Sequence, residues 1–170
     1  MPNWCRGNLV VRGTKDNVKR FLLENLKEDD LEILEDDKKL TIRSKELIFI
    51  DGTTRNFIAD DIEFNFASEE IIKECTMNEF MAAWSIAPEP YIQMSREYEI
   101  DIDLCVVEIF RGFTQEIRIQ KGEIIIDKVE EINLDFRGGD GEDPTSFNED
   151  LSSDDWKPSS LIDDLDDLPF

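Results

Sequence analysis

The stretch IDIDLCVVEIF (Ile100–Phe110) carries the clearest strand pattern in the chain. Apolar residues at 100, 102, 104 and 106 alternate with Asp101, Asp103 and Cys105. Because successive side chains of a strand point to opposite faces, this alternation predicts a strand with one buried face. Directly after it, TQEIRIQ (114–120) and EIIID (123–127) flank Lys121-Gly122, a spacing that predicts a tight hairpin. We therefore expect consecutive antiparallel strands in this part of the chain.

The N-terminal stretch predicts a strand followed by an amphipathic helix. NWCRGNLVVRG (3–13) has a short apolar run between polar residues and ends at a glycine, which favours a strand. Thr14 then suits the N-cap of a helix in TKDNVKRFLLENL (14–26). The residues at helical spacing on one face of that helix are Val18, Phe21, Leu22 and Leu26.

The middle of the chain predicts shorter elements. Asp51-Gly52 lies between the apolar runs LIFI (47–50) and TTRNFI (53–58), which indicates a second hairpin. SEEIIKEC (68–75) predicts a short helix capped by Ser68, and NEFMAAW (78–84) predicts a strand. PEPYIQMSREY (88–98) predicts a second helix, with proline in its first turn.

The order of these elements indicates an α+β fold of the split β-α-β, or ferredoxin-like, type: an antiparallel sheet with two helices on one face and an inserted hairpin. We assign the folded domain to residues 1–133, with the insert at about 27–67. The charge cluster KEDDLEILEDDKK (27–39) is expected to be an exposed excursion within that insert. The Gly-, Pro-, Ser- and acid-rich segment 134–158 is expected to be a flexible linker, and 159–170 an acidic and hydrophobic tip.

The chain of 170 residues is strongly acidic, with 41 acids against 19 bases and a formal charge of −22. From Glu131 onward there are 13 acids and two bases, so about the last quarter of the chain carries half of the net charge. A protein that binds phosphates is normally basic, so this balance argues against strong binding of duplex nucleic acid.

The sequence lacks the residues that several kinds of catalytic or binding site require. There is no histidine, which excludes Ser-His-Asp and Cys-His catalysis and ordinary zinc sites. The Gly-rich stretch RGGDGEDP (137–144) lacks the lysine that a phosphate-binding loop needs. Cys5, Cys75 and Cys105 are widely spaced and are expected to be reduced structural thiols. We therefore expect a binding protein rather than an enzyme, with no cofactor, metal or membrane partner, in the cytoplasm.

Two stretches resemble a known family. The start MPNWCRGNLVVRG and the later AAWSIAPEPYIQMSREY are similar to the YubB-type ferredoxin-like family of phages and conjugative elements, over roughly residues 2–129. The resemblance implies the split β-α-β fold and a mobile genetic element as the source, but no particular activity. Trp4, Cys5, Asn8 and Trp84 match the motifs of the family and are expected to determine the fold rather than form a site.

The final residues, DDLPF, resemble the acidic tip of bacterial single-stranded DNA-binding proteins, which ends in three aspartates, Ile or Leu, Pro and Phe. In that family the tip recruits replication and repair proteins. Here Leu165 separates two pairs of aspartates, so the acidic triplet is interrupted. The resemblance implies that a host replication or repair protein is the partner. The residues assigned to partner binding are Asp163, Asp164, Asp166, Asp167, Leu168, Pro169 and Phe170.

The residue types of the same segment are also suited to binding a partner protein. A terminal Phe170 offers a ring to bury and a carboxylate beside it for a basic side chain, and Pro169 restricts the backbone in advance. The aspartates would face a basic rim. The alternative is a solubilising acidic tail whose last residues have no partner.

Two functional classes remain open. The first is an accessory protein of DNA metabolism that recruits or competes for host proteins through the tip, and that also binds single-stranded DNA weakly. For that contact the candidate bases are Arg6, Arg12, Lys15, Lys19 and Arg20, and the candidate aromatics are Trp4, Trp84, Phe110 and Phe113. The second is an anti-defence DNA mimic, whose ordered carboxylates occupy the basic groove of a host nuclease or other DNA-binding defence protein. The sequence carries no signal for an oligomeric state.

Overall fold

The computed structural model describes residues 3–132, which form an α+β fold with two helices and eleven strands. The helices are α1 (Lys15–Asn25) and α2 (Glu89–Tyr98). The strands are β1 (Trp4–Thr14), β2 (Leu26–Lys27), β3 (Glu32–Glu35), β4 (Lys39–Arg43), β5 (Ile48–Ile50), β6 (Asn56–Ile58), β7 (Ile62–Asn65), β8 (Ile72–Ala83), β9 (Asp101–Glu108), β10 (Phe113–Gln120) and β11 (Glu123–Glu131).

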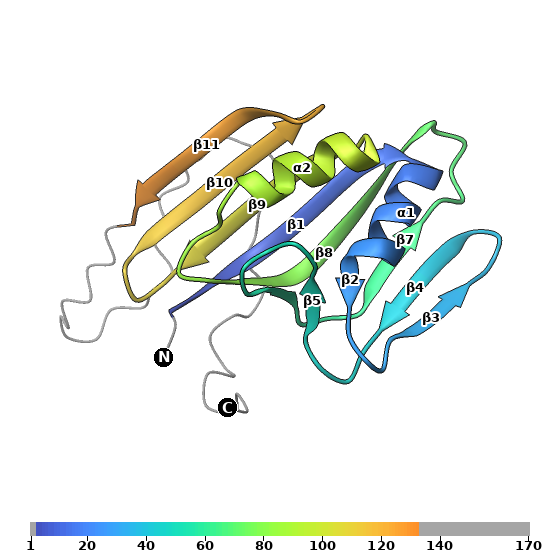
Figure 1. Ribbon diagram of the computed structural model, residues 1–170, viewed down its shortest axis with the longest axis horizontal. Helices are drawn as coiled ribbons and strands as arrows, with labels where there is room; N and C mark the ends of the chain where they lie inside the picture. Colours follow the sequence, from blue (N-terminus) through green and yellow to red (C-terminus); the bar gives the residue numbers. More distant parts are fainter. Residues whose placement is uncertain (1–2, 133–170) are drawn as a thin grey trace, which may run out of the picture. The chain divides into compact units, whose positions relative to one another are not determined.

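The strands of the described residues form two sheets, and every strand pair in them is antiparallel. The large sheet has eight strands in the order β11-β10-β9-β1-β8-β6-β5-β2, and the small sheet has the order β3-β4-β7. Both helices lie on the same face of the large sheet, with α1 against β1 and β8 and α2 against β9 and β10 (Figure 1). We call the opposite face, which carries no helix among the described residues, the open face.

The first helix forms where the sequence predicts it. The side-chain oxygen of Thr14 accepts a hydrogen bond from the backbone N–H of Asn17 at 3.3 Å, which satisfies one of the free N–H groups of the first turn. Of the four residues predicted to share one helix face, Val18, Phe21 and Leu22 lie on α1 and are buried; Leu26 is also buried but lies directly after the helix, in β2. Each buried side chain of this size contributes about 1.5–3 kcal/mol. The apolar face therefore anchors α1 to the sheet.

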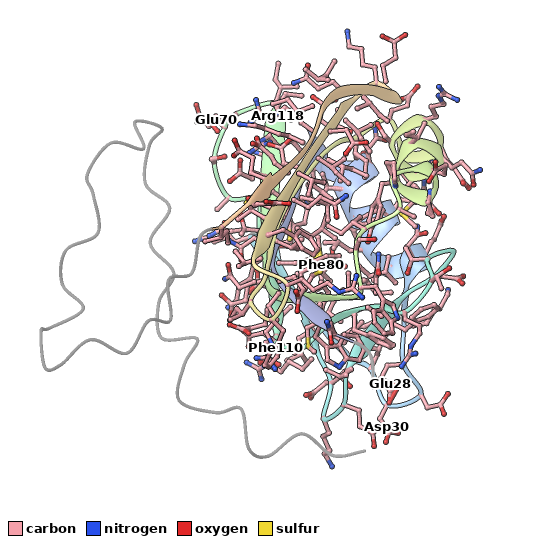
Figure 2. All side chains as sticks on the ribbon, turned by 90° about the vertical axis from the view of Figure 1, so that its left-hand side faces the viewer. Glu28, Asp30, Glu70, Phe80, Phe110 and Arg118 are labelled. Atoms are coloured by element: carbon pink, nitrogen blue, oxygen red, sulfur yellow. The ribbon has the colours of Figure 1, made fainter. Side chains whose placement is uncertain are left out.

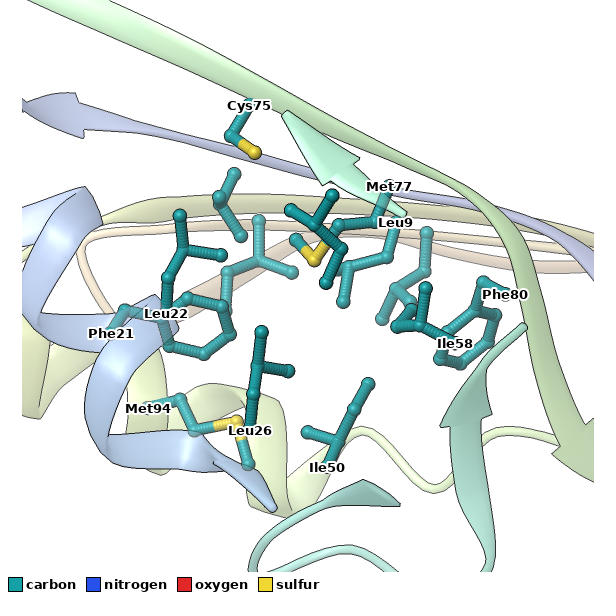
Figure 3. Close-up of a cluster of buried hydrophobic side chains, with 14 of the residues drawn as sticks. Leu9, Phe21, Leu22, Leu26, Ile50, Ile58, Cys75, Met77, Phe80 and Met94 are labelled. Carbon is teal, nitrogen blue, oxygen red and sulfur yellow. The ribbon is translucent and has the colours of Figure 1, made fainter. Parts of the chain in front are cut away.

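The core lies between the two helices and the large sheet (Figure 3). Phe21 and Leu22 of α1 and Met94 of α2 meet side chains that project from the strands, among them Leu9, Met77 and Phe80. One polar contact also crosses this layer: the hydroxyl of Tyr91 on α2 and the amide of Asn56 on β6 form a hydrogen bond of 2.7 Å. Both groups are buried, so each satisfies the other away from water.

The predicted hairpins are confirmed, and so is a strand within the predicted stretch 100–110, where β9 spans Asp101–Glu108. β9 alternates buried and more exposed residues throughout, as the sequence pattern requires. Lys121 and Gly122 both have positive φ, at 51° and 75°, which is the backbone of the tight turn expected between β10 and β11. β5 and β6 pair across the turn that contains Gly52, whose φ is 76°.

The helix predicted at residues 68–75 is wrong. The chain instead enters β8 at Ile72, and its side chains then alternate, with Cys75 and Met77 buried and Glu74 exposed. The cause is long-range pairing: Ile72 lies opposite Thr14 and Cys75 opposite Val11, so β1 supplies a partner strand for residues 72–75. A local capping signal is outweighed by that ladder.

The insert contributes more strands to the fold than the single hairpin that the sequence predicts. The charged segment 27–39, predicted as an exposed excursion, contains β3, which pairs with β4, although its four residues are exposed. β4 and β7 complete the small sheet, while β5 and β6 add strands to the large sheet beside β8. Buried Leu40, Ile42, Ile62 and Phe64 belong to the same core as the central strands. The insert is therefore a part of the fold and more than a single hairpin.

Gly7 sits at the closest approach between β1 and β9. A Cβ atom at this position would lie 1.9 Å from the carbonyl oxygen of Cys105 and 2.8 Å from the Cα of Val106. These are backbone atoms of the paired strand, so they cannot move aside without separating β1 from β9. Glycine is required here by space rather than by an unusual φ.

We expect Gly7→Ala to lower the free energy of unfolding by about 2–3 kcal/mol, because the added methyl group forces two paired backbones apart. Urea unfolding followed by circular dichroism measures this loss. Gly13→Ala in the same strand is the matched control, since its nearest obstacle is the side-chain Cγ2 of Ile100 at 2.9 Å rather than the backbone of a paired strand, so its loss should be smaller. Equal losses in the two variants would contradict the argument.

Candidate nucleic-acid and partner interface

The residues assigned to partner binding lie outside the described residues. This applies to Asp163, Asp164, Asp166, Asp167, Leu168, Pro169 and Phe170, and also to the predicted linker at 134–158. The partner-binding tip therefore stays a prediction from the sequence.

The five predicted basic residues do not form one patch. Arg6 and Arg12 lie on β1 and alternate with the buried Leu9 and Val11, so they project from the open face. Lys15, Lys19 and Arg20 lie on α1, which covers the opposite face. The sheet therefore separates the two arginines of β1 from the three bases of α1.

Most of these bases already have partners inside the domain. Arg12 forms ion pairs with Glu74 at 2.6 Å and Asp103 at 2.5 Å. Desolvation lowers the pKa of the Arg12 guanidinium, but its hydrogen bonds and attraction to the two carboxylates outweigh that effect and leave the pKa raised. Lys19 forms an ion pair with Glu35 at 2.6 Å. These groups hold elements of the fold together.

Two more bases of the predicted set contact aromatic rings. The ammonium of Lys15 lies 3.8 Å from the ring centroid of Phe66. Arg20 lies over the ring of Tyr98 at 4.9 Å and donates a hydrogen bond of 2.6 Å to the carbonyl oxygen of Glu97. Both contacts link α1 to other parts of the fold. Within the described residues, Arg6 is the one member of the predicted set that forms neither an ion pair nor a contact with an aromatic ring.

Arg6 belongs to a continuous row of side chains across the open face. Directly opposed residues of an antiparallel sheet share a face, so the register identifies the members. In the order β9, β1, β8, β6, β5 and β2 the opposed residues are Val107, Arg6, Met81, Phe57, Phe49 and Lys27. Within these six strands the row contains no carboxylate, and beyond β9 it continues through Thr114 of β10 to Glu130 of β11.

Three rings form the centre of this surface, and we call Trp4, Phe57 and Phe49 the aromatic row. The ring centroids of Trp4 and Phe57 are 6.0 Å apart, and those of Phe57 and Phe49 are 5.6 Å apart. The planes are inclined by 68° and 52°, so no ring lies flat on its neighbour. All three side chains are half-buried, and Arg55 lies over the ring of Trp4 at 5.7 Å.

Phe49, Phe57 and Arg55 were not among the residues predicted from the sequence. A signal for the two phenylalanines was present, because each lies at the centre of a short strand and is flanked by residues that are buried on the helix side. A strand whose neighbours on both sides point inward must direct its central side chain to the other face. What the sequence lacked was the pairing that brings these strands beside β8 and β1.

The other end of the open face has a different character. Asp103 contacts both Arg12 at 2.5 Å and Arg118 at 3.3 Å, and Arg118 also lies 3.6 Å from Glu116. Arg118 lies near one end of the sheet and Phe110 near the other (Figure 2). Acids and bases neutralise one another at the Arg118 end, whereas the Trp4 end combines rings with bases that have no ion pair within residues 3–132.

The remaining predicted aromatics are not in the row. Trp84 is 45% exposed and Phe110 is 79% exposed, both in loops that follow strands, and Arg111 lies over the ring of Trp84 at 5.5 Å. Phe113 packs against the core. Trp4, whose ring contacts that of Phe57, is therefore the only one of the four predicted aromatics in the aromatic row.

The three thiols differ in exposure. Burial raises the pKa of Cys5 to about 11, with the nearby charge of Glu108 adding to the effect, and burial raises the pKa of Cys75 to about 12. Cys105 is exposed on the open face, and desolvation raises its pKa as well. None of the three thiols is activated toward the thiolate, which is the nucleophilic form.

Among residues 3–132, no group of three or more His, Cys, Asp or Glu side chains is arranged to hold a metal ion. In the same part of the chain no helix is long and apolar enough to cross a membrane. Comparisons with protein-family models, with curated proteins and with solved structures find no match.

We expect one thiol of the folded protein to react with a thiol reagent at pH 8 and the other two to react only after unfolding, because Cys105 alone is exposed. Absorbance after addition of a chromogenic disulfide measures the two phases. Cys105→Ser should remove the early phase and leave the late one. An early phase that survives in this variant would contradict the burial of Cys5 and Cys75.

Proposed function

We propose that this chain is a non-enzymatic accessory protein of DNA metabolism, carried by a mobile genetic element, that recruits or competes for host replication and repair proteins. The observation that carries the proposal is the sequence of residues 163–170, in which two pairs of aspartates precede Leu168, Pro169 and Phe170. A partner recognises this segment by the chemistry of its last residue, provided that Phe170 is terminal.

In such a complex the ring of Phe170 is buried in an apolar pocket and its carboxylate meets an arginine or lysine at the rim. Pro169 fixes one backbone angle before binding, which reduces the entropy lost on binding. The aspartates contribute through the solvent to a basic surface around the pocket, so their effect is screened by salt. The ring and the carboxylate together therefore supply most of the affinity.

We also infer that the core of the domain is a split β-α-β unit of the ferredoxin-like type. The elements β1, α1, β6, β8, α2 and β9 follow one another in the required order. In space β8 lies between β1 and β6 and is antiparallel to both, while β9 pairs with the other side of β1. This arrangement supports the inference, and with it the resemblance to the YubB-type family of mobile elements.

The DNA-mimic alternative has less support. A mimic needs carboxylates that are fixed on the fold and free to meet the bases of a partner. On the open face, Glu74, Asp103 and Glu116 are fixed, but each lies beside the guanidinium of Arg12 or Arg118. Their charge is largely neutralised inside the domain, so we favour the tip as the means of binding.

We expect a peptide of residues 159–170 to compete with the tip peptide of a bacterial single-stranded DNA-binding protein for a host repair protein that binds such tips. Affinity in the micromolar range is expected, about −7 to −8 kcal/mol. Removing Phe170 should cost about 2 kcal/mol or more, because the buried ring is lost and the carboxylate is displaced. Asp166→Asn with Asp167→Asn should cost less and should reduce the salt dependence. Fluorescence anisotropy of a labelled tip peptide measures all three.

The sharpest control adds one glycine after Phe170. This change keeps every side chain and moves only the terminal carboxylate, so we expect it to weaken competition as strongly as the loss of a hot-spot contact. If the extended peptide competes as well as the peptide that ends at Phe170, the tip does not bind in the proposed way.

A further inference from the structure

We propose that the Trp4 end of the open face is a binding site for single-stranded nucleic acid. In this site the bases stack on the aromatic row of Trp4, Phe57 and Phe49, and the phosphates meet the basic side chains around it. The site lies on the folded domain and does not depend on the proposed tip.

The first support is the placement of the rings. They project from three different strands, β1, β6 and β5, onto a sheet face that no described helix covers. A soluble domain normally buries such side chains, and here they are half-buried on an open surface instead. Because no ring is stacked flat on the next, the ring faces are not occupied by stacking within the row.

The second support is charge. Arg6 lies beside Met81 in the row, Lys27 ends the row at β2, and Arg55 lies over Trp4. None of the ion pairs found among the described residues includes Arg6, Arg55 or Lys27. Three bases that form no ion pair with a described carboxylate therefore lie beside three rings, and together they form a local site that is complementary to phosphate.

The combination selects a single strand over a duplex. Aromatic side chains on a sheet stack on unpaired bases, which a duplex keeps inside its own stack. A basic surface alone would favour neither form, so the rings decide the specificity. Stacking is tolerant of sequence because every base has a flat face, and we therefore expect little sequence preference.

The net charge of the chain, −22, sets the strength of binding. The few local bases act within a repulsive field, so binding is weak at physiological salt and becomes measurable at low salt. Each phosphate contact contributes about −0.7 to the slope of log affinity against log salt for a single strand. The slope should therefore be shallow.

The test uses the full chain with fluorescein-labelled oligothymidylate, oligouridylate and a duplex of the same length, measured by anisotropy at low salt. We expect both single strands to bind more tightly than the duplex. Phe49→Leu with Phe57→Leu should weaken binding roughly tenfold or more, because leucine keeps the apolar bulk but has no ring for stacking. Phe49→Tyr with Phe57→Tyr should retain binding, since it preserves the rings.

Charge is tested separately. Arg6→Gln with Arg55→Gln should weaken binding and reduce the salt slope by about 1.4, as expected for two lost phosphate contacts. Arg43→Gln is the control for a lost arginine, because Arg43 lies on β4 of the small sheet and pairs with Asp61. Adding a glycine after Phe170 should leave oligonucleotide binding unchanged, so this site and the tip are able to fail independently.

Three outcomes would overturn the proposal. The first is that the full chain does not bind single strands at low salt. The second is that the leucine variant binds as tightly as the unchanged protein while its circular dichroism is also unchanged. The third is that the leucine variant keeps its affinity for oligonucleotide but loses self-association in light scattering, which would assign the aromatic row to contact with a second copy of the chain.

Discussion

The whole fold depends on the pairing of β1 with two strands at once. β8 lies on one side of β1 and β9 on the other, and the helices α1 and α2 follow β1 and β8 in the chain. The close approach at Gly7 is possible because glycine has no side chain to separate the backbones. Once these three strands are in register, the inward positions of β1 meet α1 and the outward positions are fixed as well. Core and surface are thus two results of one register.

The same register separates rings from ions on the open face. Trp4 and Arg6 stand at one end of β1 and Arg12 at the other, so their neighbours come from opposite ends of β8 and β9. A shift by one residue would exchange the two faces of β1 and bring Cys5 and Leu9 to the surface. The surface chemistry is therefore specified as strongly as the core, although few of its residues are buried.

Local patterns were sufficient for the elements whose partners are close in the chain. Alternation at Ile100–Val106, the cap at Thr14 and the glycine turns at Gly52 and Gly122 each predicted a feature that the structure contains. The helix predicted at 68–75 was wrong, because the strand that pairs with this segment lies about sixty residues earlier, at Val11–Thr14. The five candidate basic residues do not lie together, for a related reason. The chain turns from strand to helix at Thr14, so residues near one another in sequence reach opposite faces. The aromatic row was hidden because its rings meet only through pairing between distant strands.

The long separation between paired strands also has a consequence for the order of folding. During synthesis β1 leaves the ribosome well before β8 and β9, which pair with it at Ile72–Ala83 and Asp101–Val107. Until then its apolar side chains have no partner strands to pack with, while α1 is able to form locally. The central sheet closes only when β9 has emerged, and the nascent chain carries an unprotected strand edge until then. An acidic chain repels its own copies during that interval, so its charge protects the newly made protein from aggregation.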